Sequence, residues 1–153
     1  MMPKIDIAKA EIDRSMRYPA PLSNVLKGRE KSKLGDAIGL TQFGVNIATL
    51  PPGVWSSQRH WHANEDEFIY VLEGEIVLVE DGGEVVLKSG DAAGFKANSG
   101  NGHCLINRGS RTARYLEVGT RAGKDTVIYS DVDMRLERDG SNRRYLHKSG
   151  EPY

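Results

Sequence analysis

The chain has 153 residues, with 21 lysines and arginines balanced by 21 aspartates and glutamates, so its formal net charge is zero. This balance provides no general attraction to nucleic acid or to an anionic membrane, and we expect neither as a partner. The single cysteine, Cys104, excludes an intrachain disulfide and suits a reducing compartment. No stretch has the length and apolar character of a membrane span or a signal peptide, so we expect a single-domain cytoplasmic protein.

The first part of the chain is polar and weakly patterned, and we interpret residues 1–40 as an N-terminal extension. Residues 2–16 predict one short helix, and Pro19 and Pro21 would break a helix that continued further. Residues 27–36, KGREKSKLGD, are charged and contain two glycines, which is typical of a solvated loop.

Short apolar runs separated by turn signals begin at Phe43. GVNIATL predicts a strand that ends at Pro-Pro-Gly, and EFIYVLEGEIVLVEDGGEVVLKSGD predicts three strands joined by glycine-containing turns. HCLINRGSRTARYLEVGTR predicts two more strands around Arg-Gly-Ser. Strands at this spacing, rich in valine, isoleucine and leucine, predict an all-β sandwich or barrel, which we place at residues 41–122.

The last part of the chain, residues 123–153, is less regular. TVIY at 126–129 predicts one further strand, and the remainder is charged and rich in turn residues. We interpret this segment as a C-terminal extension that packs on the barrel or on a partner subunit, and not as a second domain.

Three of the four histidines of the chain fall in one pattern. Side chains alternate across a strand, so His60 and His62 share a face and Trp61 points the opposite way. Glu67 can begin the next strand on the histidine side, and His103 opens a later strand. Three imidazoles and one carboxylate suit a divalent first-row metal and leave positions open for water or substrate, as in a catalytic metal site. The alternative is a salt-bridged surface patch, which the concentration of histidines in one pattern disfavours.

The stretch that contains the histidine pair resembles the first motif of the cupin superfamily, G-x5-H-x-H-x3-4-E-x6-G. In this chain the motif has the members Gly53, His60, His62, Glu67 and Gly74, and the first gap is six residues long. The motif thus contains the histidine pair and Glu67, the residues that strand alternation places on one face.

A second stretch, GDAAGFKANSGNGHCLIN, resembles the second cupin motif, G-x5-P-x-G-x2-H-x3-N. Gly90, His103 and Asn107 occur in the order that the motif requires, and Lys96 stands at the position of its proline. The resemblance covers roughly residues 40–122 and implies a cupin-type double-stranded β-helix, which is a jelly-roll barrel, with short N-terminal and C-terminal extensions.

The resemblance also implies a metal centre inside that barrel. Its ligands would be His60, His62, Glu67 and His103, and it would hold one divalent ion per chain, namely zinc, manganese, iron or nickel. A ligand set without thiolate disfavours copper(I) and leaves the choice among the others open.

Other residues near the motifs have two interpretations each. Tyr115 and Glu117 share a face in RYLEV, and are either acid and base groups inside the barrel or part of a dimer contact outside it. Arg59 either anchors an anionic substrate or forms a surface ion pair. Asn107 either hydrogen-bonds near the metal or ends its strand. Cys104 follows a ligand, so it points away from the metal and acts as a small buried hydrophobe.

Two classes of function follow. The first is a metal-dependent enzyme that acts on a small, oxygen-bearing, anionic substrate, by isomerisation of the sugar-phosphate type, by decarboxylation, by lyase chemistry or, with iron, as a dioxygenase. The second is a module that binds or senses a small ligand without turnover; a barrel that has lost its metal is a third option. Exposed sheet edges need cover, so we expect a homodimer in which residues 1–40 can cross to the partner.

Overall fold

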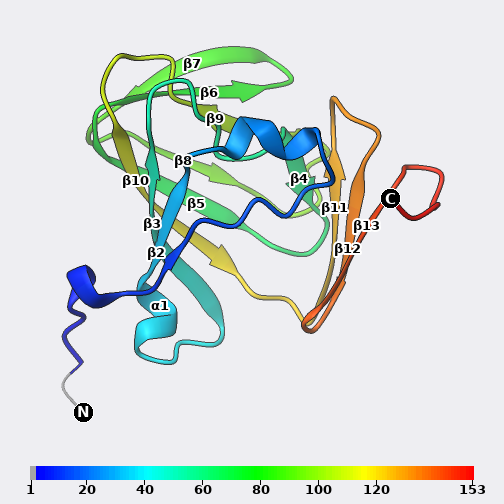
Figure 1. Cartoon of the computed structure of the whole chain (residues 1–153), viewed down its shortest axis with the longest axis horizontal. Coiled ribbons are helices and arrows are strands. Elements are labelled where there is room, and N and C mark those ends of the chain that lie inside the picture. The colour runs from blue at the N-terminus through cyan, green and yellow to red at the C-terminus, as the bar shows by residue number, and fades with distance from the viewer. Residues whose placement is uncertain (1–2) are drawn as a thin grey trace.

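The computed structural model describes residues 3–153, which fold almost entirely into antiparallel strands (Figure 1). The strands are β1 (Ile12–Asp13), β2 (Glu30–Lys33), β3 (Phe43–Leu50), β4 (His60–His62), β5 (Glu67–Glu73), β6 (Glu75–Glu80), β7 (Gly83–Lys88), β8 (Ala92–Phe95), β9 (Cys104–Ile106), β10 (Ala113–Thr120), β11 (Lys124–Tyr129), β12 (Arg135–Asp139) and β13 (Asn142–Leu146). The helical elements are the 3-10 turns η1 (Ile7–Lys9) and η2 (Leu22–Leu26) and the short helix α1 (Leu34–Ala37).

These strands form the two walls of a jelly-roll barrel. One wall is a six-stranded sheet with the order β1-β2-β3-β10-β5-β8. The other wall consists of a four-stranded sheet, β13-β12-β11-β4, and a three-stranded sheet, β7-β6-β9. An isolated bridge between His60 and His103 joins these two sheets, and another, between Trp55 and Ile106, ties the segment before β4 to β9. The predicted all-β jelly-roll fold is confirmed.

The inner face of the six-stranded sheet changes character along its length. On β10 the inward residues are Ala113, Tyr115 and Glu117, in that order. Ala113 and Tyr115 belong to the main hydrophobic core, which is buried between the two walls. Glu117 instead pairs with Asn46 on β3, and Gly119 pairs with Glu67 on β5. The barrel interior is therefore apolar at one end and polar at the other.

The predicted N-terminal helix over residues 2–16 was wrong within the described part of the chain. Only the turn η1 is helical, and the backbone of Ile12 pairs with that of Ser32 in the neighbouring strand. The predicted loop over residues 27–36 was also wrong, because it contains β2 and α1. The segment lacks the apolar alternation by which a strand is usually predicted, because Lys31 faces the polar end of the interior instead of an apolar core.

The N-terminal extension packs against both walls of the barrel (Figure 1). Ala10 and Leu34 form a small core with Ile47 on the outer side of the six-stranded sheet. Tyr18 and Leu22 pack against the buried residues of the four-stranded sheet. The segment between them therefore runs from one wall to the other and brings its polar side chains to the barrel interior.

The C-terminal part of the chain builds the wall that carries the histidine pair. The strand predicted at residues 126–129 is confirmed as part of β11, which pairs with β4. β12 and β13 continue the same sheet beyond β11 (Figure 1). No helix within residues 3–153 has the length and apolar character needed to cross a membrane.

Candidate metal centre

The short strand β4 sets the orientation of both histidines of the pair. Its backbone pairs with β11 on one side, where Tyr129 lies opposite His60 and Val127 opposite His62. On the other side the backbone of His60 exchanges two hydrogen bonds with His103, of 3.0 and 2.9 Å. The register fixes His60 and His62 on one face of β4, and it places the third histidine directly beside the first.

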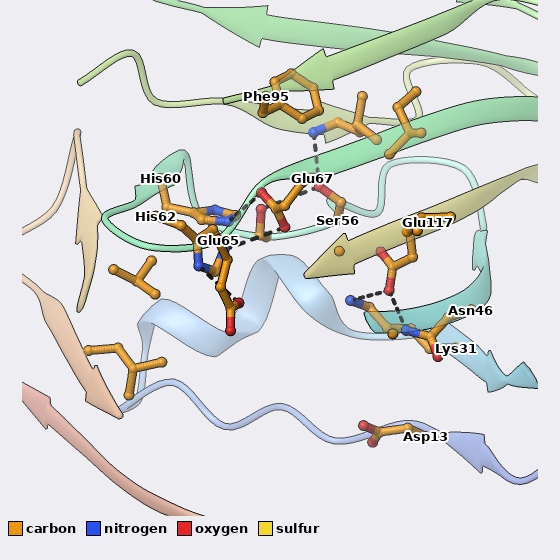
Figure 2. A pocket seen from close by; sticks show the side chains of 18 of the residues that line it. Asp13, Lys31, Asn46, Ser56, His60, His62, Glu65, Glu67, Phe95 and Glu117 are labelled. Atoms are coloured by element: carbon orange, nitrogen blue, oxygen red, sulfur yellow. Dashed lines mark hydrogen bonds and ion pairs between the residues drawn. The ribbon is translucent and has the colours of Figure 1, made fainter. Parts of the chain in front are cut away.

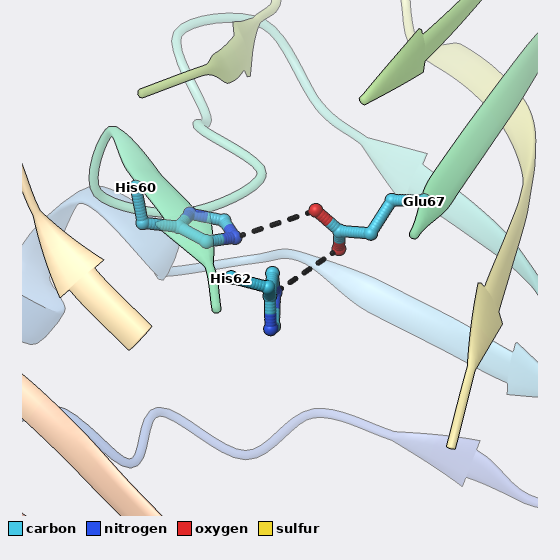
Figure 3. A group of neighbouring side chains, drawn as sticks. All are labelled: His60, His62 and Glu67. Atoms are coloured by element: carbon cyan, nitrogen blue, oxygen red, sulfur yellow. Dashed lines mark ion pairs between the residues drawn. The ribbon is translucent and has the colours of Figure 1, made fainter. Parts of the chain in front are cut away.

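The three imidazoles converge on the carboxylate of Glu67, the first residue of β5. The Nε2 atoms of His60 and His103 lie 3.7 and 2.8 Å from its Oε2 atom. The Nε2 atom of His62 lies 3.4 Å from Oε1. Figure 3 shows the carboxylate facing both rings of the histidine pair, with one oxygen directed to each. Ligand atoms of His60, His62 and Glu67 all lie within 4.8 Å of one another, and His103, the fourth predicted ligand, contacts the same carboxylate from outside that group.

Hydrogen bonds on the far side of each ring of the pair orient the Nε2 atoms toward this point. The Nδ1 atom of His60 donates to the carbonyl oxygen of Gln58 at 2.8 Å. The Nδ1 atom of His62 lies 2.6 Å from a carboxylate oxygen of Asp125. Such partners fix the ring orientation and tautomer of histidines that ligate metals.

A second group of acids stands behind His62, and it includes Glu65 and Asp125. This group faces Nδ1 of His62, which is already bonded to Asp125. Glu65 is held by an ion pair with Arg138 and accepts a hydrogen bond from the backbone of Ala122 at 3.1 Å. We interpret these acids as supports for His62 and not as a second centre.

The electrostatics of the four residues are strongly perturbed. Burial lowers the pKa of His60 to about 3 despite the nearby Glu67 carboxylate. Burial also acts to lower the pKa of His62, but its hydrogen bonds to Asp125 and Glu67 outweigh burial and raise that pKa to about 10. Burial acts to raise the pKa of Glu67, yet contacts with His103 and His62 hold it well below its usual range.

The donor set fits a divalent cation. The Oε2 atom of Glu67 is buried and has no hydrogen bond of good geometry within residues 3–153, although His103 lies close to it. An anionic oxygen left in this condition is costly unless a cation compensates it. A metal that bound the three Nε2 atoms and this carboxylate would supply that charge, in a mixed nitrogen and oxygen shell suited to zinc, manganese, iron or nickel.

The cluster opens into a cavity of about 480 Å³ at the polar end of the barrel (Figure 2). On one side the cavity wall is aromatic, because the ring of Phe95 stacks on His103 with centroids 3.6 Å apart. On the other side it is formed by polar residues of β2, β3 and β10. The volume is in the range of small-molecule sites.

A second carboxylate lies on the same wall as the first. Glu117 pairs with Ile69, which is two residues after Glu67, so the two carboxylates share the inner face of the sheet. Asn46 Nδ2 and Lys31 Nζ both lie 2.9 Å from the Oε1 atom of Glu117 (Figure 2). Both contacts fall on one oxygen, which leaves Oε2 available.

Tyr115 lies deeper in the same cavity and is almost completely buried. Burial raises the pKa of its phenol well above the usual range, and the carboxylates of Glu117 and Glu67 raise it further. Tyr115 and Glu117 thus both face the interior. This position favours the interpretation as acid and base groups inside the barrel over a dimer contact on its outer surface.

Arg59 and Asn107 have other partners. Arg59 donates two hydrogen bonds to Asp131, of 2.9 and 2.8 Å, and pairs with Asp81, so the ion-pair interpretation is the favoured one. The amide of Asn107 is fully buried, and it donates to the carbonyl oxygens of Leu50 and Arg111, both at 2.8 Å. Its side chain therefore holds the loop after β9 instead of facing the cavity.

Cys104 is buried, as expected, and burial raises the pKa of its thiol to about 11. Sequence reasoning missed three residues of the site, Lys31, Asn46 and Asp125. Each is polar in a segment that showed no motif, and only the strand pairing brings it to the cluster. A buried aspartate at the start of an apolar run such as DTVIY is the one signal that the sequence contains for Asp125.

The fold is an antiparallel jelly-roll barrel, and three imidazoles and one carboxylate point into its interior. These two features together define a class of small barrel proteins whose interior carries residues of the kind that bind metals. A model of the cupin domain matches residues 46–119 of this chain. A crystal structure of a sugar phosphate isomerase from a cupin superfamily, from Silicibacter pomeroyi DSS-3, is 44% identical, with a TM-score of 0.96 over 99% of this chain and 96% of that chain. This chain belongs to the cupin superfamily.

Two curated relatives are similar over part of their length. An oxalate-binding protein from Thermotoga maritima is 38% identical over 69 residues, which are 45% of this chain and 54% of the relative. The tetracenomycin polyketide synthase protein TcmJ from Streptomyces glaucescens is 28% identical over 98 residues, or 63% of this chain and 64% of the relative. The match thus spans between half and two thirds of each curated relative.

Proposed function

We propose that the chain is a metal-dependent enzyme that acts on a small, anionic, oxygen-bearing substrate, with isomerisation of a phosphorylated sugar as the leading reaction. The observation that carries this proposal is the second carboxylate, Glu117, on the same cavity wall as the ligand cluster. The similarity of the whole chain to a sugar phosphate isomerase supports the choice of reaction. Decarboxylation and lyase chemistry are the other reactions that this arrangement suits.

Isomerisation of a sugar moves a proton between neighbouring carbon atoms, which requires a base beside a polarised carbonyl group. A divalent ion held by His60, His62, Glu67 and His103 would polarise that carbonyl as a Lewis acid. Glu117 would take and return the proton through its Oε2 atom, since Lys31 and Asn46 hold its other oxygen in place.

The proposal is tested by measuring metal content and turnover together. We expect about one divalent ion per chain, lost in His60→Ala. We expect Glu117→Gln to keep the metal and lose turnover on a phosphorylated aldose by about 10²–10⁴-fold, the usual contribution of a general base. The matched control is Glu75→Gln, an exposed residue of β6 that pairs with Lys88 at 3.8 Å outside the cavity.

A chain that binds no divalent ion, or a Glu117→Gln variant with undiminished turnover, would contradict this proposal. Iron as the bound metal would direct the assays to oxygen consumption and to the dioxygenase alternative. The identity of the metal thus separates two classes of chemistry before any substrate is known.

One observation favours a second candidate, a binding module without turnover. The oxalate-binding relative is 38% identical over the central part of this chain. A module of this kind would bind a small dicarboxylate such as oxalate and raise the melting temperature of the protein, but it would release no product. Calorimetric binding without turnover would favour this candidate.

We also propose that two copies of the chain associate through the outer face of β5. Phe68, Tyr70 and Leu72 alternate on that strand and are 43, 40 and 41% exposed. Three large apolar side chains in one row form the kind of surface that partners cover. A second copy would bury them and protect the sheet edge beside them.

A further inference from the structure

Arg29 brings a positive charge to the same cavity from the N-terminal extension. It immediately precedes β2 and lines the cavity together with His60 and Tyr115. Its Nη1 atom donates to the carbonyl oxygen of Ser56 at 2.5 Å, and its Nη2 atom to that of Ser15 at 3.1 Å. Both partners are neutral, so they orient the guanidinium without compensating its charge.

Most other cations along this cavity differ from Arg29 because they have carboxylate partners. Lys31 pairs with Glu117 at 2.9 Å, and Arg121 pairs with Asp36 at 2.5 Å. Within residues 3–153 no carboxylate lies within 4.0 Å of the Arg29 guanidinium. Arg143 also lacks such a partner, but it is exposed at the rim, where water compensates its charge.

The donors of Arg29 are also incompletely used. A guanidinium has five N–H groups, and two of them are engaged by the two carbonyl oxygens. The Nε atom is buried and has no hydrogen-bond partner within the described residues. A partly buried cation with free donors is costly by itself, and an oxyanion that binds it in bidentate fashion removes that cost.

We propose that Arg29 is the anion anchor of the cavity, and that its guanidinium binds a phosphate or carboxylate group of the ligand whose other oxygens lie at the histidine cluster. This inference rests on the proposed function, because it assumes that the cluster holds the opposite end of the same ligand. Ser56 accepts the Arg29 hydrogen bond through its carbonyl oxygen and lines the same cavity as Glu67 (Figure 2).

The shape of the anchor narrows the class of ligand. One end must carry a group with at least two anionic oxygens, which match the planar fork of a guanidinium. The other end must offer carbonyl or hydroxyl oxygens to the cluster. A phosphate monoester of a polyhydroxy compound and a small dicarboxylate both meet these requirements, whereas an uncharged sugar does not.

The test is calorimetric binding of three probes to the purified protein: glycerol 3-phosphate, malonate, and glycerol as the uncharged control. We expect at least one of the two anions to bind the unaltered chain and glycerol to bind far more weakly. Arg29→Gln should weaken the binding of that anion at least tenfold. The anion that shows the larger loss identifies phosphate or carboxylate as the natural group.

Two further variants keep the test decisive. Arg29→Lys retains the charge and the contact with a backbone carbonyl but loses the fork, so we expect anion binding at least threefold weaker, with an unchanged melting temperature. This variant replaces Arg29→Gln in the comparison if the latter does not fold. Arg108→Gln, an exposed arginine paired with Glu84 at 2.5 Å outside the cavity, should bind the anions as the unaltered chain does.

Equal affinity in the unaltered chain and in the Arg29 variants would overturn the inference, and so would a failure of both anions to bind the unaltered chain. Metal content, measured on the same samples, separates this failure from a failure of the proposed function. If the protein binds metal and turns over substrate but binds the anion equally well without Arg29, only the proposed role of Arg29 is rejected. If anion binding depends on Arg29 but the protein has neither metal nor turnover, the enzyme proposal is rejected and the role of Arg29 in anion binding stands.

Discussion

Asp125 is a buried side chain that orients a candidate metal ligand, His62, without being in the predicted ligand set itself. Its exposed fraction is 3%, and its two oxygens are both engaged on the histidine side of the barrel. One lies 2.6 Å from Nδ1 of His62, and the other accepts the backbone N–H of Asn64 at 2.9 Å. The ring of His62 is therefore fixed from behind by a group that is itself fixed.

We expect Asp125→Asn to weaken metal binding by about 10–100-fold, the usual effect of removing the carboxylate behind a ligating histidine. Competition with a chelator of known affinity measures this change. The control is Asp131→Asn, because Asp131 pairs with Arg59 outside the cavity and has no contact with the ligands. Unchanged affinity in Asp125→Asn would mean that Gln58 and the strand pairing suffice to orient the histidine pair.

The four ligand candidates could be predicted from the sequence because their chemistry and their spacing agree. His60 and His62 share a face through simple alternation, and the motif spacing identifies Glu67 and His103. The residues that orient and complement them could not be predicted in this way. Asp125 lies more than sixty positions after His62 along the chain, and nothing local indicates that β11 pairs with β4.

At the level of secondary structure, the turn at Gly74 joins β5 to β6 and closes the motif that begins with the histidines. Gly74 has a φ angle of +77°, and a Cβ atom there would lie 3.0 Å from the carbonyl oxygen of Thr112 and 3.1 Å from Cα of Ala113. Both neighbours are backbone atoms that cannot move independently. The glycine is thus required by the backbone conformation and by the lack of space.

We expect Gly74→Ala to lower the free energy of unfolding by about 1–3 kcal/mol from backbone conformation, with the backbone contacts adding to this loss. Urea denaturation measures it. Gly82→Ala is the matched control, because no atom lies within 4 Å of a Cβ atom at Gly82 and its φ angle is not in the left-handed region. A loss at Gly74 no larger than that at Gly82 would contradict the prediction.

The strands of the core could be predicted because their apolar alternation matches the buried faces of the barrel. β2 could not be predicted by the same reasoning, since its residues Glu30 to Lys33 are all partly buried and none is apolar. This strand faces a polar cavity, so the usual pattern of a strand is absent where it contributes to the site. The prediction failed where the interior of the barrel is itself polar.

At the level of the whole molecule, the two walls of the barrel leave the apolar row on β5 uncovered by the described part of the chain. We expect a solution mass of twice the chain mass of 16.9 kDa by light scattering after gel filtration. Phe68→Glu combined with Leu72→Glu should reduce the mass to that of one chain. Val85→Glu on β7, which is 51% exposed, is the control for a charge added elsewhere.

A monomeric mass for the unaltered chain would reject the association, and a dimeric mass for the double variant would move it to another surface. The metal content should be the same in both states, because the ligand cluster and the cavity are built from residues of one chain. Association and metal binding are therefore separate properties that can be measured independently.

The crossing of the N-terminal extension from one wall of the barrel to the other has a consequence for the order in which the protein becomes functional. During synthesis Arg29 and Lys31 leave the ribosome early, whereas the strand that positions His62 is among the last to appear. Contacts between such distant parts of a chain form slowly, because the intervening loop must first be closed. The cavity therefore completes only when nearly all of the chain is available, and metal uptake would report the end of folding instead of its beginning.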